Sequence, residues 1–190
     1  AGSLLEFALN DLKYSMPVGR IEFLYMGPMT FNEFLMAKGE AYVLKKIKTL
    51  TQLEQISDAF HQKCIKLLKE YLFVGGMPEA VKLASENELE EVSRIHEQIV
   101  ETYKNDFVKY TKKNNLIKIQ KVFQHIYLNP CKKIKYSNIS AEDTSRDLKR
   151  NLELLFMAKL ATPVYHTKCS GVPLEISKDE SVFKSLVLDV

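Results

Sequence analysis

The sequence contains no tryptophan and little cysteine, glycine or proline: three Cys, seven Gly and six Pro in 190 residues. So few turn-forming residues argue against a large all-β fold, which needs many tight turns. The three cysteines are an odd number without a C-x-x-C spacing, which excludes a disulfide framework and predicts reduced thiols. No stretch reaches the roughly 18 consecutive apolar residues of a membrane-spanning helix, so no membrane is expected among the partners.

Two signatures of nucleotide hydrolysis are also missing from the sequence. No glycine is followed by Gly-Lys-Ser or Gly-Lys-Thr at the spacing of a phosphate-binding loop. No apolar run ends in Asp-Glu, the pair that would hold magnesium. We therefore expect that this chain alone takes no cofactor and does not hydrolyse ATP.

The histidines and cysteines do not form a convincing metal site. Two H-x-x-C pairs occur, His61 with Cys64 and His166 with Cys169. Zinc would need four ligands brought together by folding, and Cys64 already belongs to an apolar helical stripe. We predict no bound metal.

Hydrophobic residues make up 46% of the chain and charged residues 27%, and nine Tyr and ten Phe can anchor a core. This composition suits one globular domain or two small ones. The N-terminal segment AGSLLEFALND has no basic leader and no cleavage site, which predicts a cytoplasmic protein. The chain begins without Met and ends within the apolar run SLVLDV, so we expect a fragment of a longer protein.

The net charge of +3 is unevenly distributed along the chain. Residues 1–103 hold 11 Lys and Arg against 15 Asp and Glu, a net −4. Residues 104–168 hold 14 against 5, a net +9, and residues 169–190 hold 2 against 4, a net −2. The basic middle block is either a nucleic-acid footprint or a solvated, lysine-rich helix surface.

Apolar residues recur at helical spacing along most of the chain, which predicts a mainly α fold with minor β. A capping box of Thr30 and Glu33 predicts a short helix, and a second box, Thr51 with Glu54, predicts a long helix ending at Gly75-Gly76. Further helices are expected over residues 4–9, after Pro78, over 87–110, from Leu116 to Ile126 and over 146–158. The run GRIEFLYM predicts one strand, buried on both faces, whose partners would lie outside this chain.

The last hundred residues predict, in order, a helix, a short strand, a short helix, a helix and a two-stranded hairpin. TPVYHT and VPLEI are the expected hairpin strands. This order is typical of a winged helix-turn-helix, in which the helix at 146–158 would lie in the major groove. Arg146, Lys149 and Arg150 lie off the apolar stripe of that helix and are expected to face outward. Other winged helices pack only against protein.

Two further features allow more than one interpretation. Arg20 lies between a Pro-Val-Gly turn and the predicted strand, where it can project from the fold or pair with Glu22. The segment Gly75-Gly76-Met77-Pro78 can approach an anion closely, or it can be a helix end followed by a proline at the first position of the next helix.

The run PVGRIEFLYMGPMTFNEFL is followed in order by EYLFVGGMPEAV, YKNDFVKY, KIKYSNI and VFKSLVLDV. Together they resemble the prokaryotic AAA-type ATP-binding proteins, relatives of the archaeal ATPase and STAND-like groups. The C-terminal half of that family joins a winged helix to a PD-(D/E)xK nuclease-like domain of unknown function. The resemblance implies the end of an ATPase core at residues 1–29, a helical lid at 30–110, a winged helix at 111–174 and the start of the nuclease-like domain at 175–190.

The resemblance also implies roles for single residues in the parent protein, which would bind ATP and Mg²⁺. Ser3 is its sensor candidate, and Arg20 occupies the position of an arginine finger that reaches the γ-phosphate in a neighbouring subunit. Gly76 and Pro78 match the G-x-P motif of the lid that closes on the nucleotide. Asp189 would lie in the first strand of the nuclease-like domain. The Walker A loop and the Walker B strand would precede Ala1.

We therefore expect the lid and winged-helix part of an AAA-type protein, inactive as an ATPase by itself. Its expected partners are double-stranded DNA, the remainder of the ATPase and a second copy of the chain. The alternative is a protein-docking module that does not bind nucleic acid. In that case Val164, Tyr165, Val172 and Leu174 would form an exposed apolar patch or a dimer contact.

Overall fold

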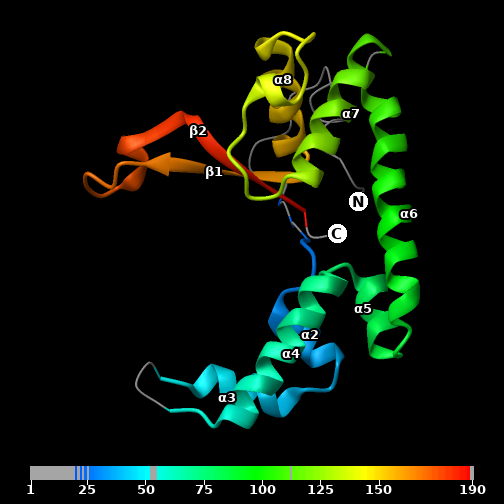
Figure 1. Ribbon diagram of the computed structural model, residues 1–190, viewed down its shortest axis with the longest axis vertical. Helices are drawn as coiled ribbons and strands as arrows, with labels where there is room; N and C mark the ends of the chain where they lie inside the picture. Colours follow the sequence, from blue (N-terminus) through cyan, green and yellow to red (C-terminus); the bar gives the residue numbers. More distant parts are fainter. Residues whose placement is uncertain are drawn as a thin grey trace. The chain divides into compact units, whose positions relative to one another are not determined.

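The computed structural model describes residues 20, 22, 24, 26–51, 55–111 and 113–188. This part of the chain is mainly helical and carries a two-stranded antiparallel sheet, which confirms the predicted fold class (Figure 1). The chain divides into two compact units, one built mainly from residues 23–101 and the other mainly from residues 102–188. The long helix α6 (Leu89–Tyr110) contributes to both.

The described part of the 23–101 unit is helical. Its helices are α2 (Phe31–Ala37), α3 (Ala41–Thr49), α4 (Asp58–Val74), α5 (Pro78–Ser85) and the first half of α6. The predicted capping box is present at α2, because the Thr30 hydroxyl accepts the Glu33 N–H and the Glu33 carboxylate accepts the Thr30 N–H. Pro78 occupies the start of α5, as predicted.

The predicted helix start at Thr51 is wrong. Helix α4 begins after Ser57, whose hydroxyl accepts the N–H of Phe60 (3.4 Å) and so caps the helix. Helix α3, which the sequence analysis did not predict, precedes it and buries Val43 and Leu44. The expected long helix is therefore present as α4 and ends before Gly75 as predicted, but it starts seven residues later than Thr51, at Asp58.

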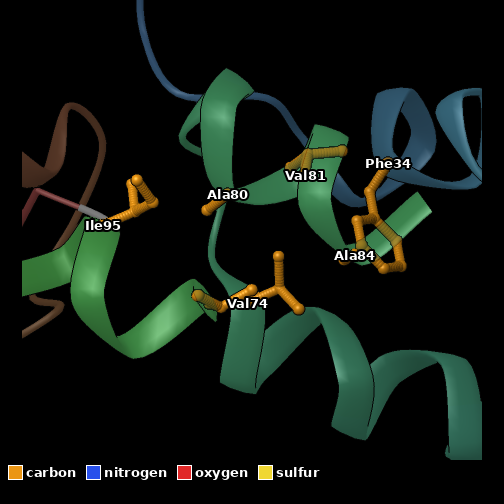
Figure 2. Packing of buried hydrophobic residues seen from close by; sticks show 7 residues of the cluster. Phe34, Val74, Ala80, Val81, Ala84 and Ile95 are labelled. Atoms are coloured by element: carbon orange, nitrogen blue, oxygen red, sulfur yellow. The ribbon is translucent and has the colours of Figure 1, made fainter. Parts of the chain in front are cut away.

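Two apolar clusters fill the interior of this unit. One gathers side chains from α2, α4, α5 and α6, as Figure 2 shows for most of its members: Phe34, Val74, Ala80, Val81, Ala84, Val92 and Ile95. The other joins α2 to α3 and α4: Leu35, Val43, Leu44, Phe60 and Leu67. Helix α2 contributes to both clusters, because its adjacent residues Phe34 and Leu35 point to different neighbours.

In the 102–188 unit, six elements follow the last residues of α6. They are α7 (Lys113–Leu128), a 3-10 turn η1 (Tyr136–Asn138), α8 (Ser145–Met157), strand β1 (Ala161–Thr167), a 3-10 turn η2 (Leu174–Ser177) and strand β2 (Lys178–Val187). Helices α7 and α8 pack together, and α8 also contacts β1. The buried core of this unit includes Phe107, Ile119, Val122, Phe123, Ile126, Leu148, Leu152, Leu155 and Phe183.

The second hairpin strand lies later in the chain than predicted. Strand β1 pairs with β2, so VPLEI belongs to the connecting loop and forms η2 rather than a strand. The alternation of buried Phe183 and Ser185 with exposed Lys184 and Leu186 gives β2 a core face and an outer face. The Ile134 N–H donates to the carbonyl of Phe183 (3.1 Å), which adds a short third segment to the sheet.

The predicted strand at GRIEFLYM is not observed in the residues that the structure describes. Arg20, Glu22, Leu24 and Met26 lie outside any strand and are exposed. Among the described helices, none combines the length and the apolar character needed to cross a membrane.

Candidate nucleic-acid interface

Helix α8 presents basic side chains outward because its opposite face is anchored in the core. The Thr144 hydroxyl accepts the N–H of Asp147 (3.2 Å) and caps the helix start. The buried side chains of this helix include Leu148, Leu152 and Leu155. Its exposed side chains include the three cations singled out in the sequence: Arg146, Lys149 and Arg150.

These three cations share one face of α8, since their spacings of three and four residues place them side by side on a helix. Glu153 lies on the same face, and its carboxylate is 3.8 Å from the Lys149 ammonium. Neither Arg146 nor Arg150 forms an ion pair with any residue in the described part of the chain. The face of α8 is thus basic, with one acidic side chain within it.

Two lysines of α7, Lys118 and Lys121, behave differently, because carboxylates neutralise them within the unit. Lys121 contacts Asp143 (2.9 Å), and Lys118 contacts both Asp147 and, at 3.9 Å, Asp143. The hydrogen bond from Lys121, followed by that from Ser140, lowers the pKa of Asp143, and the hydrogen bond from Lys118 lowers the pKa of Asp147. These two lysines hold α7 to the start of α8 rather than offering free charge.

A buried amide, absent from the sequence-based predictions, also orients α8. The Asn151 side chain is fully buried, and its amide donates to Asn115 Oδ1 and to the carbonyl of Asp147, both at 2.9 Å. Asn151 stands beside Leu152 and one turn from Leu148 and Leu155, on the helix face that contacts the core. A polar residue within an apolar stripe was the signal that could have identified it.

The loop between β1 and β2 carries exposed apolar side chains. The exposed fractions of Val172, Leu174 and Ile176 are 93%, 53% and 82%. Tyr165 is different, because its ring lies against Phe183 and under the Lys178 ammonium, which is 4.0 Å from the ring centre. Of the patch predicted for protein docking, Val164, Val172 and Leu174 are exposed and Tyr165 is partly covered.

Gly76 approaches the backbone of its own unit closely. The Met29 N–H donates to the Gly76 carbonyl (2.7 Å), and a Cβ atom added at Gly76 would lie 2.4 Å from the Met29 oxygen. The Tyr71 hydroxyl donates to that same Met29 oxygen (2.8 Å). This contact explains the glycine without a ligand, and the exposed Pro78 occupies the first position of α5.

The remaining sequence candidates are not gathered into a site. Arg20 is exposed, and no ion pair joins it to Glu22 within the described residues. Arg20 and Gly76 belong to different units. Ser3 and Asp189 lie outside the described residues. In the described part of the chain, no three His, Cys, Asp or Glu side chains gather as a metal site would require.

Residues 65–190, two thirds of the chain, match the family model described as "Domain of unknown function (DUF8612)". The chain belongs to the DUF8612 family. The matched region begins within α4 and contains α7, α8, the hairpin and the basic face described above. No curated protein and no solved structure matches the chain.

Proposed function

We propose that residues 113–187 form a winged helix that binds duplex DNA through α8, as part of a larger cytoplasmic AAA-type ATP-binding protein. This range replaces the expected 111–174, because the second strand of the hairpin, β2, runs to Val187. The order of elements supports this: α7, η1 and α8 are followed by the β1–β2 hairpin, with Ile134 adding the short third segment. The observation that carries the proposal is the exposed cationic face of α8, opposite a face buried in the core.

The chemistry of this face suits a DNA major groove, which is about 12 Å wide and admits an α-helix. Arg146 and Arg150 can each donate two parallel hydrogen bonds to a phosphate or to a guanine edge. Lys149 adds a point charge beside them. Glu153 would favour the amino group of cytosine and oppose phosphate, so it would contribute specificity rather than affinity.

The nucleotide-related roles remain predictions for the parent protein. Arg20 would act as the arginine finger, Ser3 as the sensor residue, and Gly76 with Pro78 as the lid motif, with ATP and Mg²⁺ bound by the rest of the ATPase. At Gly76 the approach of the Met29 backbone already accounts for the glycine. We therefore derive no reaction step from these positions.

The test is the affinity for duplex DNA as a function of salt concentration. The logarithm of the binding constant should fall with a slope of about −0.9 per phosphate contact. Replacing Arg146, Lys149 and Arg150 with Ala should weaken binding about tenfold or more at low salt and should flatten that slope. A salt-independent affinity of the unaltered chain, or no binding at low salt, contradicts the proposal.

A charge-matched control separates this face from overall charge, and a substitution within the face tests it further. Lys45, Lys48 and Lys82 are exposed on α3 and α5, so replacing them with Ala removes three positive charges from the other unit. This variant should bind DNA as the unaltered chain does, and an equal loss in both variants would contradict a specific role of α8. Glu153→Gln should instead strengthen binding, because it removes a like charge from the phosphate-facing surface and frees Lys149.

A further inference from the structure

Helix α4 carries an exposed apolar surface that its own unit leaves uncovered. We call it the α4 stripe, made of the exposed Leu68, Leu72 and Phe73 and the half-buried Ile65. The exposed fractions of Leu68, Leu72 and Phe73 are 37%, 74% and 55%. The other face of α4 is already used, because it buries Phe60, Leu67 and Val74 in the two clusters.

Two exposed lysines of α4, Lys66 and Lys69, place positive charge near the α4 stripe. Lys69 lies three residues from Leu72 and four from Phe73, so it stands beside the stripe. Lys66 lies seven residues, about two helical turns, before Phe73, on the same side of the helix. Neither lysine forms an ion pair with any described residue. The nearest carboxylate in sequence, Glu70, is held by Lys38 (2.8 Å) and does not neutralise them.

The loop of the β1–β2 hairpin has the opposite charge around a similar apolar surface. We call the exposed side chains of Val172, Leu174 and Ile176 the wing tip. Three carboxylates, Glu175, Asp179 and Glu180, stand in or beside it, against two lysines, Lys168 and Lys178. Lys178 and Glu180 pair with each other (3.1 Å), and the Lys178 ammonium also lies over the Tyr165 ring. Glu175 and Asp179 against Lys168 leave the surroundings of the wing tip with a net charge of −1.

We propose that the wing tip of one copy of this chain docks on the α4 stripe of a second copy. The wing tip and the α4 stripe are complementary, because each has an exposed apolar centre and the charges around the two centres have opposite signs. Phosphates would repel the acidic wing tip, so DNA is a poor occupant for it. The contact is heterologous, since it joins different surfaces on the two chains, and it therefore builds rings or open arrays.

Few side chains form each surface, so the contact belongs with the weak interfaces that bury less than about 1,200 Å² in total. The unaltered chain should therefore show an average mass that rises with protein concentration in sedimentation velocity. Leu72→Asp and Ile176→Asp should each abolish this rise, because each buries a charge in the contact. Both positions are highly exposed, so neither substitution disturbs a core.

Mixing the two variants gives the decisive measurement. Each retains one intact surface, so the wing tip of the Leu72→Asp chain can still dock on the stripe of the Ile176→Asp chain. The mixture should form a 1:1 dimer that grows no further. A monomeric mixture, or self-association of either variant alone, overturns the proposal, and so does an unaltered chain that stays monomeric at every concentration.

Charge reversal tests the complementarity separately. Exchanging both Lys66 and Lys69 for Glu should abolish association, and adding Glu175→Lys and Glu180→Lys in the same chain should restore it. Met36→Asp is the matched control, since Met36 is 64% exposed on α2 and belongs to neither surface. Loss of association in the control, or no restoration by the exchange, overturns the proposal. If Ile176→Asp weakens DNA binding and leaves association unchanged, DNA is the occupant instead.

Discussion

The contact between Gly76 and Met29 shows how one residue without a side chain joins two segments. It brings the chain entering α2 against the turn between α4 and α5, next to the cluster that contains Phe34 and Val74. Because backbone atoms line the position, no side-chain rearrangement can make room for a Cβ. This steric reason applies whether or not a nucleotide is bound nearby.

We predict that Gly76→Ala destabilises the 23–101 unit by about 1–3 kcal/mol, the usual cost of overpacking. Hydrogen exchange of the α2 and α5 amides reports the free energy of opening directly. Gly27→Ala is the matched control, because a Cβ at Gly27 would meet no atom within 4 Å, and it should change the stability by no more than about 0.5 kcal/mol. Equal effects of the two substitutions would contradict the steric explanation.

At the residue scale, the sequence predicted the outward cations of α8 but not its buried amide. Arg146, Lys149 and Arg150 follow directly from helical periodicity, since the Leu residues of this helix specify its inner face. The same periodicity places Asn151 on the inner face, but it does not reveal the partner Asn115, which lies 36 residues earlier in the chain. A long-range polar pair leaves no periodic signal.

At the scale of elements, the errors occurred where local patterns compete. VPLEI alternates apolar and polar residues as a strand does, yet β1 pairs with the longer KDESVFKSLV, which offers more ladder partners and buries Phe183 and Ser185. Likewise the Thr51–Glu54 spacing matches a capping box, but the helix starts after Ser57. Strand pairing and the choice between neighbouring caps depend on tertiary packing, which the local sequence does not encode.

The ion pairs between α7 and α8 predict a dependence of stability on pH. Lys118 and Lys121 lower the pKa values of Asp147 and Asp143 below the ordinary value of an aspartate, so the stabilisation is complete above about pH 4 and is lost as the pH falls through the folded-state pKa values. Hydrogen exchange of the α7 and α8 amides, measured from pH 5 downward, should show protection decreasing in this range. High salt should reduce the effect by screening.

One substitution tests whether these carboxylates cause the loss of stability at low pH. Lys118→Met removes the hydrogen bond that mainly lowers the pKa of Asp147, so stability should depend less on pH below pH 4. Lys135→Met is the control, because Lys135 is exposed and pairs with no carboxylate among the described residues. An unchanged acid profile in Lys118→Met would show that other groups cause the acid dependence.

At the scale of the whole molecule, the family boundary does not coincide with the structural units. The match to DUF8612 begins at residue 65, inside α4, whereas the cores of the 23–101 unit need side chains that come earlier. Phe34 belongs to one cluster, and Leu35 and Phe60 belong to the other. In the part of the other unit that the structure describes, the core side chains run from Phe107 to Phe183 and lie within the matched region.

We therefore predict that a chain shortened to residues 65–190 keeps one unit and loses the other. Removing large buried side chains such as Phe34 or Leu35 costs about 2–5 kcal/mol each, and a domain has only about 5–15 kcal/mol of stability in total. Amides of α5 and the first half of α6 should exchange rapidly in the shortened chain, while those of α7, α8, β1 and β2 stay as protected as in residues 1–190. Persistent protection over residues 78–100 would mean that the α5 and α6 side chains of the family region form a core without α2.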